Sequence, residues 1–293
     1  MKTLSRERQG EILIFFEILI WSFFPIVSKL AFLEIEPIFT VAISSLLAGV
    51  FFSLVLTFRK QWHQFVNIPW KETLLAIFLI GVCLYFFLFL GMKMTTAGNT
   101  AMFGQFEILF SFLLLSVFIK HEKWYWPHVL GAILMLLGAL VVLFPGEFRV
   151  NYGDLLVIFS MGFAPLGNFY AQKVLKKISS VYFMMMRSFL AGGVLFCLAG
   201  LFEVWPTIDN LEGSFVFLIL NGVVIFGLSK VLWLESISRM PITKATSLNS
   251  FGVLITLVFA YFILNEVPTV WQVCGVVPIL GGVVLLLKED ETV

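Results

Sequence analysis

RSFLAG at positions 187–192 is a near-copy of SSLLAG at positions 44–49. A second pattern, an acidic residue followed by two glycines, recurs at almost the same offset in Glu122…Gly131…Gly138 and Glu266…Gly275…Gly282. Self-similarity over such a long period means that a chain is built from repeated structural units, and it decides the architecture before any single motif does. The sequence therefore predicts two copies of one fold unit joined in series.

The composition is that of a protein that lies in a lipid bilayer. Hydrophobic residues make up 60% of the 293 residues, and charged residues only 13%, which is about half the fraction usual in soluble proteins. A formal net charge of +1 argues against nucleic acid as a partner, and the three cysteines lack the spacing of a metal site or redox pair. The sequence predicts an all-α integral membrane protein surrounded by membrane lipids, with no cofactor, no metal and no catalytic residue.

The apolar runs are long enough for ten transmembrane helices, each of which needs about 20 residues. Turn-forming residues, mostly proline, glycine and asparagine, separate the runs. Five helices fall in each copy of the repeat, so we expect a first repeat over residues 1–145 and a second over residues 152–290. The predicted helices cover residues 10–33, 37–58, 72–92, 97–119, 124–144, 153–172, 180–203, 213–236, 243–264 and 270–288.

Lysine and arginine predict the orientation, because they are enriched on the cytoplasmic side of membrane proteins. Placing the N-terminus in the cytoplasm leaves only Lys93 and Arg149 in the outer connections. Both termini are then cytoplasmic, and the protein spans the cytoplasmic (inner) membrane. An odd number of helices in each repeat inverts the second repeat relative to the first and creates a pseudo-twofold axis in the membrane plane. A site on that axis can open to either side, which is the physical basis of alternating access.

The stretch from Trp21 to Lys29 resembles the signature in the first helix of EamA-type permeases of the drug/metabolite transporter (DMT) superfamily. Arg187 resembles their arginine near the start of a repeat's second helix, and Glu122 and Glu266 resemble their acidic residue before a repeat's last helix. The resemblance covers essentially the whole chain. It implies a central cavity lined by helices one, three, four, six, eight and nine, with helices five and ten at the periphery.

Four ionisable residues lie well inside predicted helices, where charge is costly and is therefore functional by default. Counted along straight helices, Glu17, Arg187 and Lys230 lie at a similar depth. They predict either a neutralising cluster that fixes helix packing or forms an inner gate, or a site for substrate or protons. Glu107 has no cation at its depth on this count. We expect a proton or substrate-amine site there, the alternative being a protonated carboxyl group that only packs.

Neutral polar and aromatic residues extend the predicted site. Gln105 and Asn249 occupy equivalent positions of the two repeats and should approach one another near the axis, as substrate ligands or as an interhelical hydrogen bond. Pro25 and the stretch from Gly162 to Asn168 should loosen their helices, which is tolerated at membrane depth where backbone lines a cavity. Aromatic side chains expected to suit an apolar or cationic moiety are Trp21, Tyr85, Phe103 and Trp233.

These features favour a secondary active transporter that moves a small metabolite, such as an amino acid or an amino-acid derivative, by proton coupling, exchange or uniport. Its candidate substrate-binding residues are Glu17, Trp21, Tyr85, Phe103, Gln105, Glu107, Asn168, Lys230, Trp233 and Asn249, and its candidate gating or ion-pair residues are Glu17, Arg187 and Lys230. A lipid or polyprenyl-lipid flippase of the same fold is the alternative. An intramembrane enzyme is disfavoured because the sequence contains no zinc-protease or serine-hydrolase motif. The solute, its direction and the oligomeric state stay open.

Overall fold

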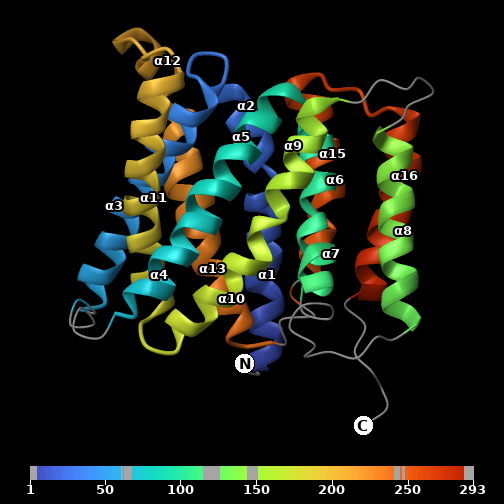
Figure 1. Cartoon of the computed structure of the whole chain (residues 1–293), viewed down its shortest axis with the longest axis horizontal. Coiled ribbons are helices and arrows are strands. Elements are labelled where there is room, and N and C mark those ends of the chain that lie inside the picture. Colours follow the sequence, from blue (N-terminus) through green and yellow to red (C-terminus); the bar gives the residue numbers. More distant parts are fainter. Residues whose placement is uncertain are drawn as a thin grey trace.

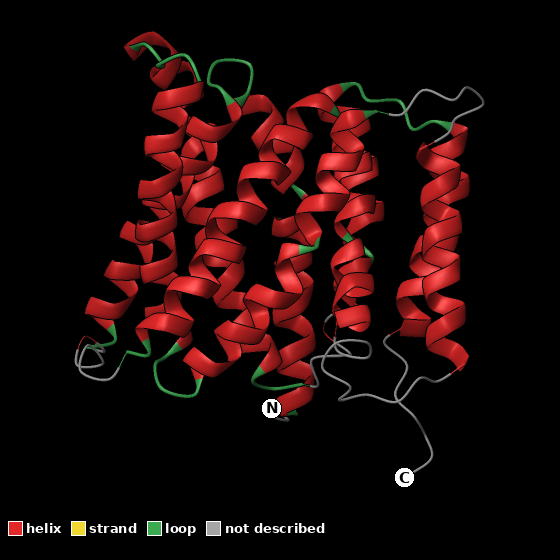
Figure 2. Ribbon diagram, viewed as in Figure 1, coloured by secondary structure: helices red, strands yellow, loops and turns green. Residues whose placement is uncertain are grey.

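The computed structural model describes residues 5–60, 62, 68–114, 126–143, 151–240, 245 and 248–286. Within those ranges every regular element is a helix (Figure 2). Seven helical segments there are long and apolar enough to cross a membrane, and residues 248–264 and 270–286 form shorter apolar helices. The chain is therefore an all-helical integral membrane protein, as its composition predicts.

The helices follow one another in the predicted order. The predicted helix ends at residues 119, 144 and 288 lie outside the described ranges, as do Glu122 and most of residues 243–247. The elements are α1 (Arg6–Ser22), α2 (Phe24–Ala31), α3 (Pro37–Phe58), α4 (Trp70–Ala76), η2 (Ile77–Cys83), α5 (Leu84–Met94), α6 (Ala97–Gly104), α7 (Phe106–Leu113), α8 (Trp126–Leu143), α9 (Tyr152–Met161), α10 (Phe163–Leu175), α11 (Ser180–Phe202), α12 (Ile208–Ile219), η4 (Leu220–Ser229), α13 (Lys230–Ile237), α15 (Gly252–Leu264) and α16 (Val270–Leu286).

Two of the predicted helices are interrupted close to a proline. The first helix breaks between α1 and α2, just before Pro25, and the sixth breaks between α9 and α10 at Gly162, just before Pro165. Proline has no N–H group to bond the carbonyl four residues earlier, so the helical ladder is open at these points. The predicted loosening of both helices is confirmed. A further break separates α6 from α7 at Gln105, where no proline is present.

Two π-helical segments lie inside longer helices. η2 connects α4 to α5, and η4 connects α12 to α13. Their first residues, Ile77 and Leu220, are related by the same offset that relates SSLLAG to RSFLAG. Turns of this kind are rare and often occur at functional sites. Lys230 follows η4 directly, so the π-helical segment sets the direction of its side chain.

Helix packing pairs segments that are far apart in the sequence (Figure 1). α3 packs against α11, and α8 packs against α16. α5 packs against α9, as α13 packs against α1. α1 begins and α16 ends at the same end of the bundle, which is the lower end in Figure 1. We call this the N-terminal end, and the opposite one the distal end.

Glycines bring α8 and α16 into backbone contact at the edge of the bundle (Figure 1). A Cβ atom added to Gly138 would lie 2.8 Å from the carbonyl oxygen of Gly275, and one added to Gly131 would lie 2.8 Å from the carbonyl oxygen of Gly282. Small residues allow this close approach in membranes, where no hydrophobic effect drives helices together. The glycine spacing that recurs in the sequence therefore allows the close packing of one helix pair, α8 with α16.

Gly138→Leu should separate this pair, because a backbone carbonyl cannot move aside as a flexible side chain can. We expect a loss of about 3 kcal/mol in the free energy of unfolding, the upper end of the usual cost of overpacking, measured by thermal unfolding in detergent. The matched control is Gly281→Leu on α16, where an added Cβ atom meets nothing within 4 Å. Equal melting temperatures for the two variants would contradict the glycine interface.

Candidate functional site

A buried ion pair joins α1 to α13 inside the bundle. Glu17 is fully buried, and its Oε1 lies 3.9 Å from Nζ of Lys230 and accepts a hydrogen bond of 3.1 Å from the hydroxyl of Ser229. Its other oxygen, Oε2, has no hydrogen-bond partner in the part of the chain that the structure describes. A buried carboxylate is stable only when it is paired and hydrogen-bonded. Glu17 therefore depends on Lys230, and half of its acceptor capacity is unused.

The ammonium group of Lys230 contacts both a carboxylate and an aromatic ring. Its Nζ lies 3.3 Å from the centre of the Trp21 ring, one helical turn beyond Glu17. Trp21 in turn stacks on Phe24, with ring centres 4.9 Å apart. An indole ring attracts a cation over its face. Trp21 and Glu17 thus form one binding site for a positive charge. The ammonium group of Lys230 occupies this site in this conformation.

A second carboxylate, Glu107, lies in the first turn of α7, just after the break at Gln105. Its Oε1 accepts a hydrogen bond of 3.0 Å from Nδ2 of Asn168, which lies on α10 beyond the break at Gly162. Lys230 is close enough to interact electrostatically with Glu107 as well. Glu107 is thus within electrostatic range of Lys230, although no ion pair joins the two among the described residues. Depth counted along straight α-helices ignores both the break at Gln105 and the π-helical segment before Lys230.

Arg187 faces an aromatic group rather than Glu17. Its guanidinium carbon lies 5.7 Å from the ring centre of Tyr85, which is buried and packs against Phe226. Arg187 also interacts electrostatically with Lys230. Among the described residues no ion pair joins Arg187 to Glu17, so the predicted three-membered cluster is reduced to the pair of Glu17 and Lys230.

Among the described residues, no hydrogen bond or ion pair joins the remaining candidates to these charges. Phe103 is fully buried in the main core and packs against Phe106. Trp233 packs on a separate apolar cluster around Ile14, Ile18 and Met240. Gln105 and Asn249 are both described, and no hydrogen bond joins them. The structure thus groups seven of the predicted residues, Glu17, Trp21, Tyr85, Glu107, Asn168, Arg187 and Lys230, while the roles of Phe103, Gln105, Trp233 and Asn249 stay predictions.

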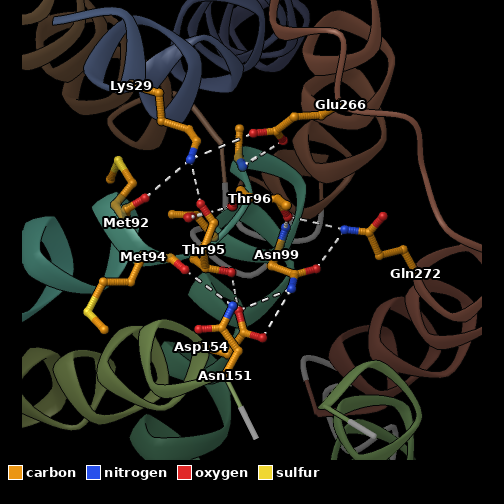
Figure 3. Close-up of polar contacts among 12 residues, drawn as sticks. Lys29, Met92, Met94, Thr95, Thr96, Asn99, Asn151, Asp154, Glu266 and Gln272 are labelled. Atoms are coloured by element: carbon orange, nitrogen blue, oxygen red, sulfur yellow. Dashed lines mark hydrogen bonds and ion pairs between the residues drawn. The ribbon is translucent and has the colours of Figure 1, made fainter. Parts of the chain in front are cut away.

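A polar cluster at the distal end, which the sequence alone does not predict, is shown in Figure 3. Its hub is Asp154, which is almost completely buried and accepts hydrogen bonds from Thr95 and Asn99. Two signals pointed to it: the repeated Gly10-Glu11 and Gly153-Asp154 pairs, and Lys29 and Glu266 of the family signature, which also belong to the cluster. Neither signal by itself indicates a site.

The comparisons with known proteins identify the class of protein. Residues 8–144 and residues 151–288 each match the EamA-like transporter family. The chain belongs to this family. It is therefore a membrane protein of a transporter family.

Individual relatives are distant. The chain is similar to the uncharacterized transporter YoaV of Bacillus subtilis, at 20% identity over 90% of this chain and 92% of that protein. It is 21% identical to an uncharacterized transporter of Synechocystis, with 69% of this chain aligned to 61% of that protein. It is 25% identical to the S-adenosylmethionine uptake transporter of Rickettsia conorii over 70% of each chain. A solved crystal structure shares the fold, with a TM-score of 0.67 at 17% identity over 94% of this chain and 96% of that one.

Proposed function

We propose that this chain is a secondary active transporter that moves a small metabolite across the cytoplasmic membrane by alternating access. The observation that carries the proposal is the convergence of Glu17, Lys230, Glu107 and Asn168 inside the helix bundle. Ionisable groups occur at membrane depth mainly where they bind a substrate, an ion or a proton that passes through the protein. No nucleotide-binding motif occurs in the sequence, so an ion or solute gradient is the proposed source of energy.

We further propose the architecture of ten transmembrane helices in two inverted repeats, residues 1–145 and 152–290. Three observations support it: the family matches the chain twice, η2 and η4 start at equivalent positions, and α5 packs on α9 as α13 packs on α1. Inverted repeats allow two packings of similar energy around one central site. The excess of Lys and Arg on the side of the N-terminus supports a cytoplasmic position for that end.

The charges favour a zwitterionic substrate, an amino acid or an amino-acid derivative. The site contains two carboxylates, Glu17 and Glu107, and two cations, Arg187 and Lys230, so a substrate with both signs can pair with each without a net change of buried charge. The guanidinium of Arg187 suits a carboxylate, and Glu107 with Asn168 suits an amine. S-adenosylmethionine is itself an amino-acid derivative, so the name of the Rickettsia relative is consistent with this class.

A ligand screen by thermal shift tests the substrate class. Purified protein should melt at a higher temperature with selected amino acids, S-adenosylmethionine or nucleosides, because a ligand stabilises the state that binds it. The shift should be lost in Glu107→Ala but kept in Glu36→Gln, which alters a carboxylate near the distal surface. Stabilisation by polyprenyl phosphates alone would favour the flippase instead.

The orientation is testable by cysteine labelling in intact cells. In a cysteine-free background, a cysteine at Asp209 in the first turn of α12 should react with an impermeant external thiol reagent, and one at Ser179, the N-cap of α11, should be shielded. The two helices begin at opposite ends of the bundle (Figure 1). Labelling at Ser179 would contradict the proposed orientation. Asn67 and Glu147, which lie between predicted helices and would serve the same test, are outside the described residues.

A further inference from the structure

The distal cluster consists of Lys29, Thr95, Thr96, Asn99, Asp154, Glu266 and Gln272 (Figure 3). Asp154, near the start of α9, accepts a hydrogen bond from the hydroxyl of Thr95 and from Nδ2 of Asn99, which lies 3.1 Å from both carboxylate oxygens. Hydrogen bonds to an ionised acceptor are stronger than those between neutral groups. Asp154 thus holds the end of α5 and the start of α6 against α9.

Asn99 extends this contact to a further helix. Its Oδ1 accepts a hydrogen bond of 2.7 Å from Nε2 of Gln272, near the start of α16. The same Nε2 donates to the hydroxyl of Thr96 at 3.2 Å. Since one amide side chain can both donate and accept, Asn99 forms a continuous link from α9 through α6 to α16.

Lys29 and Glu266 close the cluster from its other side. Nζ of Lys29, in the last turn of α2, lies 3.7 Å from Oε1 of Glu266 and donates to the carbonyl of Thr95. Oε2 of Glu266 accepts a hydrogen bond of 2.8 Å from the backbone N–H of Ala97, at the start of α6. A carboxylate at a helix N-terminus satisfies N–H groups that have no partner inside the helix.

The side-chain bonds of Asp154, Gln272 and Glu266 to α6 and its neighbours all join one proposed repeat to the other. The matched contrast is the ion pair of Lys93 and Glu36, which lies at the same end but within the first repeat. If the repeats separate at the distal end, the side-chain bonds of Asp154, Gln272 and Glu266 must break. The ion pair of Lys93 with Glu36 can stay intact.

The cluster also lies between the candidate site and the distal face. Lys29 is twelve residues beyond Glu17 on the same pair of helices, and Asp154 is fourteen residues before Asn168. Lys29 and Asp154 lie beyond the breaks in their helices, on the distal halves α2 and α9 (Figure 1). A solute that leaves the site toward the distal end must therefore pass the level of the cluster.

We propose that the distal cluster is the gate that closes the transport path toward the distal face, and that this structure is the conformation in which the gate is shut. The inference rests on the proposed transport function. The hydrogen bonds of Asp154 and the ion pair of Lys29 with Glu266 stabilise the closed state. When the gate opens, these hydrogen bonds and this ion pair must break, and the same groups must bind water instead.

A single reporter cysteine tests the gate from both sides of the membrane. Asn168→Cys, in a background without Cys83, Cys197 and Cys274, places a thiol beside Glu107 at a position that is exposed in this structure. An impermeant maleimide should label it readily in inside-out vesicles and slowly in intact cells. The gate variant combines Asp154→Ala with Glu266→Gln, and Glu36→Gln is the control.

The gate variant should raise the labelling rate in intact cells by about tenfold, because loss of several charge-assisted hydrogen bonds shifts a two-state equilibrium by at least that factor. Labelling in inside-out vesicles should fall at the same time. Equal increases on both sides would show general loosening, and unchanged rates would show a static contact; either result would overturn the gate.

Gln272→Ala provides a second variant that changes no charge, in case the double variant does not fold. It should shift the labelling in the same direction by a smaller factor, and no shift would count against the gate. The labelling does not require transport. Absence of transport by the parent protein would refute the proposed function and leave the labelling result separate.

Discussion

We expect Glu107→Gln to abolish accumulation driven by a pH gradient and to leave counterflow intact. Glutamine keeps the shape of the side chain and an oxygen that can accept the hydrogen bond from Asn168, but it cannot take up or release a proton. Accumulation in a gradient needs net proton movement, whereas counterflow needs only the exchange of substrate. The measurement is uptake of labelled ligand into proteoliposomes with and without an imposed pH gradient, with Glu36→Gln as the control.

Two other outcomes of this experiment identify different roles for Glu107. Loss of both kinds of uptake, together with loss of ligand binding, would make the carboxylate a substrate ligand for an amine. If gradient-driven uptake and binding both equal those of the parent protein, Glu107 only packs against Asn168, and its assignment to the site is wrong.

Lys230→Met should cause the largest loss of stability of any single substitution in the site. Within the described part of the chain, it leaves the fully buried Glu17 with one hydrogen bond, from Ser229, and no cation within ion-pair distance. Removing one partner of a buried pair typically costs about 3–5 kcal/mol. The measurement is thermal or denaturant unfolding in detergent.

The double variant Glu17→Gln with Lys230→Met should recover part of that loss, because it leaves no buried charge unpaired. Glu17→Gln with Arg187→Met should be close to additive, since Arg187 faces Tyr85 instead of Glu17. Additivity in the first cycle would mean that Glu17 and Lys230 do not interact.

Much of the fold follows from the sequence, because a membrane leaves the backbone few choices. Long apolar runs predict helices, and Pro25 and Pro165 mark two of the breaks. The glycine spacing that first revealed the repeat turned out to be the contact surface of α8 and α16. The π-helical segments η2 and η4 have no comparable signal, because a π-helical turn depends on how neighbouring helices pack.

The site could be predicted only in part, and its residues show why. Glu17, Lys230, Glu107 and Arg187 stand out because charge is rare in apolar helices. Which of them face one another depends on the rotation of each helix about its axis. That rotation cannot be predicted for helices that are apolar all round, because they have no distinct hydrophobic face. Asn99, Thr95 and Gln272 look like ordinary helix-end residues in the sequence, and only the tertiary arrangement brings them around Asp154.

Counterflow by the parent protein tests the central claim, alternating access to the site of Glu17, Lys230 and Glu107, most directly. Sealed proteoliposomes are loaded with the unlabelled amino acid or S-adenosylmethionine that gives the largest thermal shift, and are then diluted into a trace of the same compound in radioactive form, without ATP or an ion gradient. We predict a transient internal accumulation above equilibrium that protein-free vesicles lack. Tight binding of that compound with no accumulation above protein-free vesicles would contradict the account.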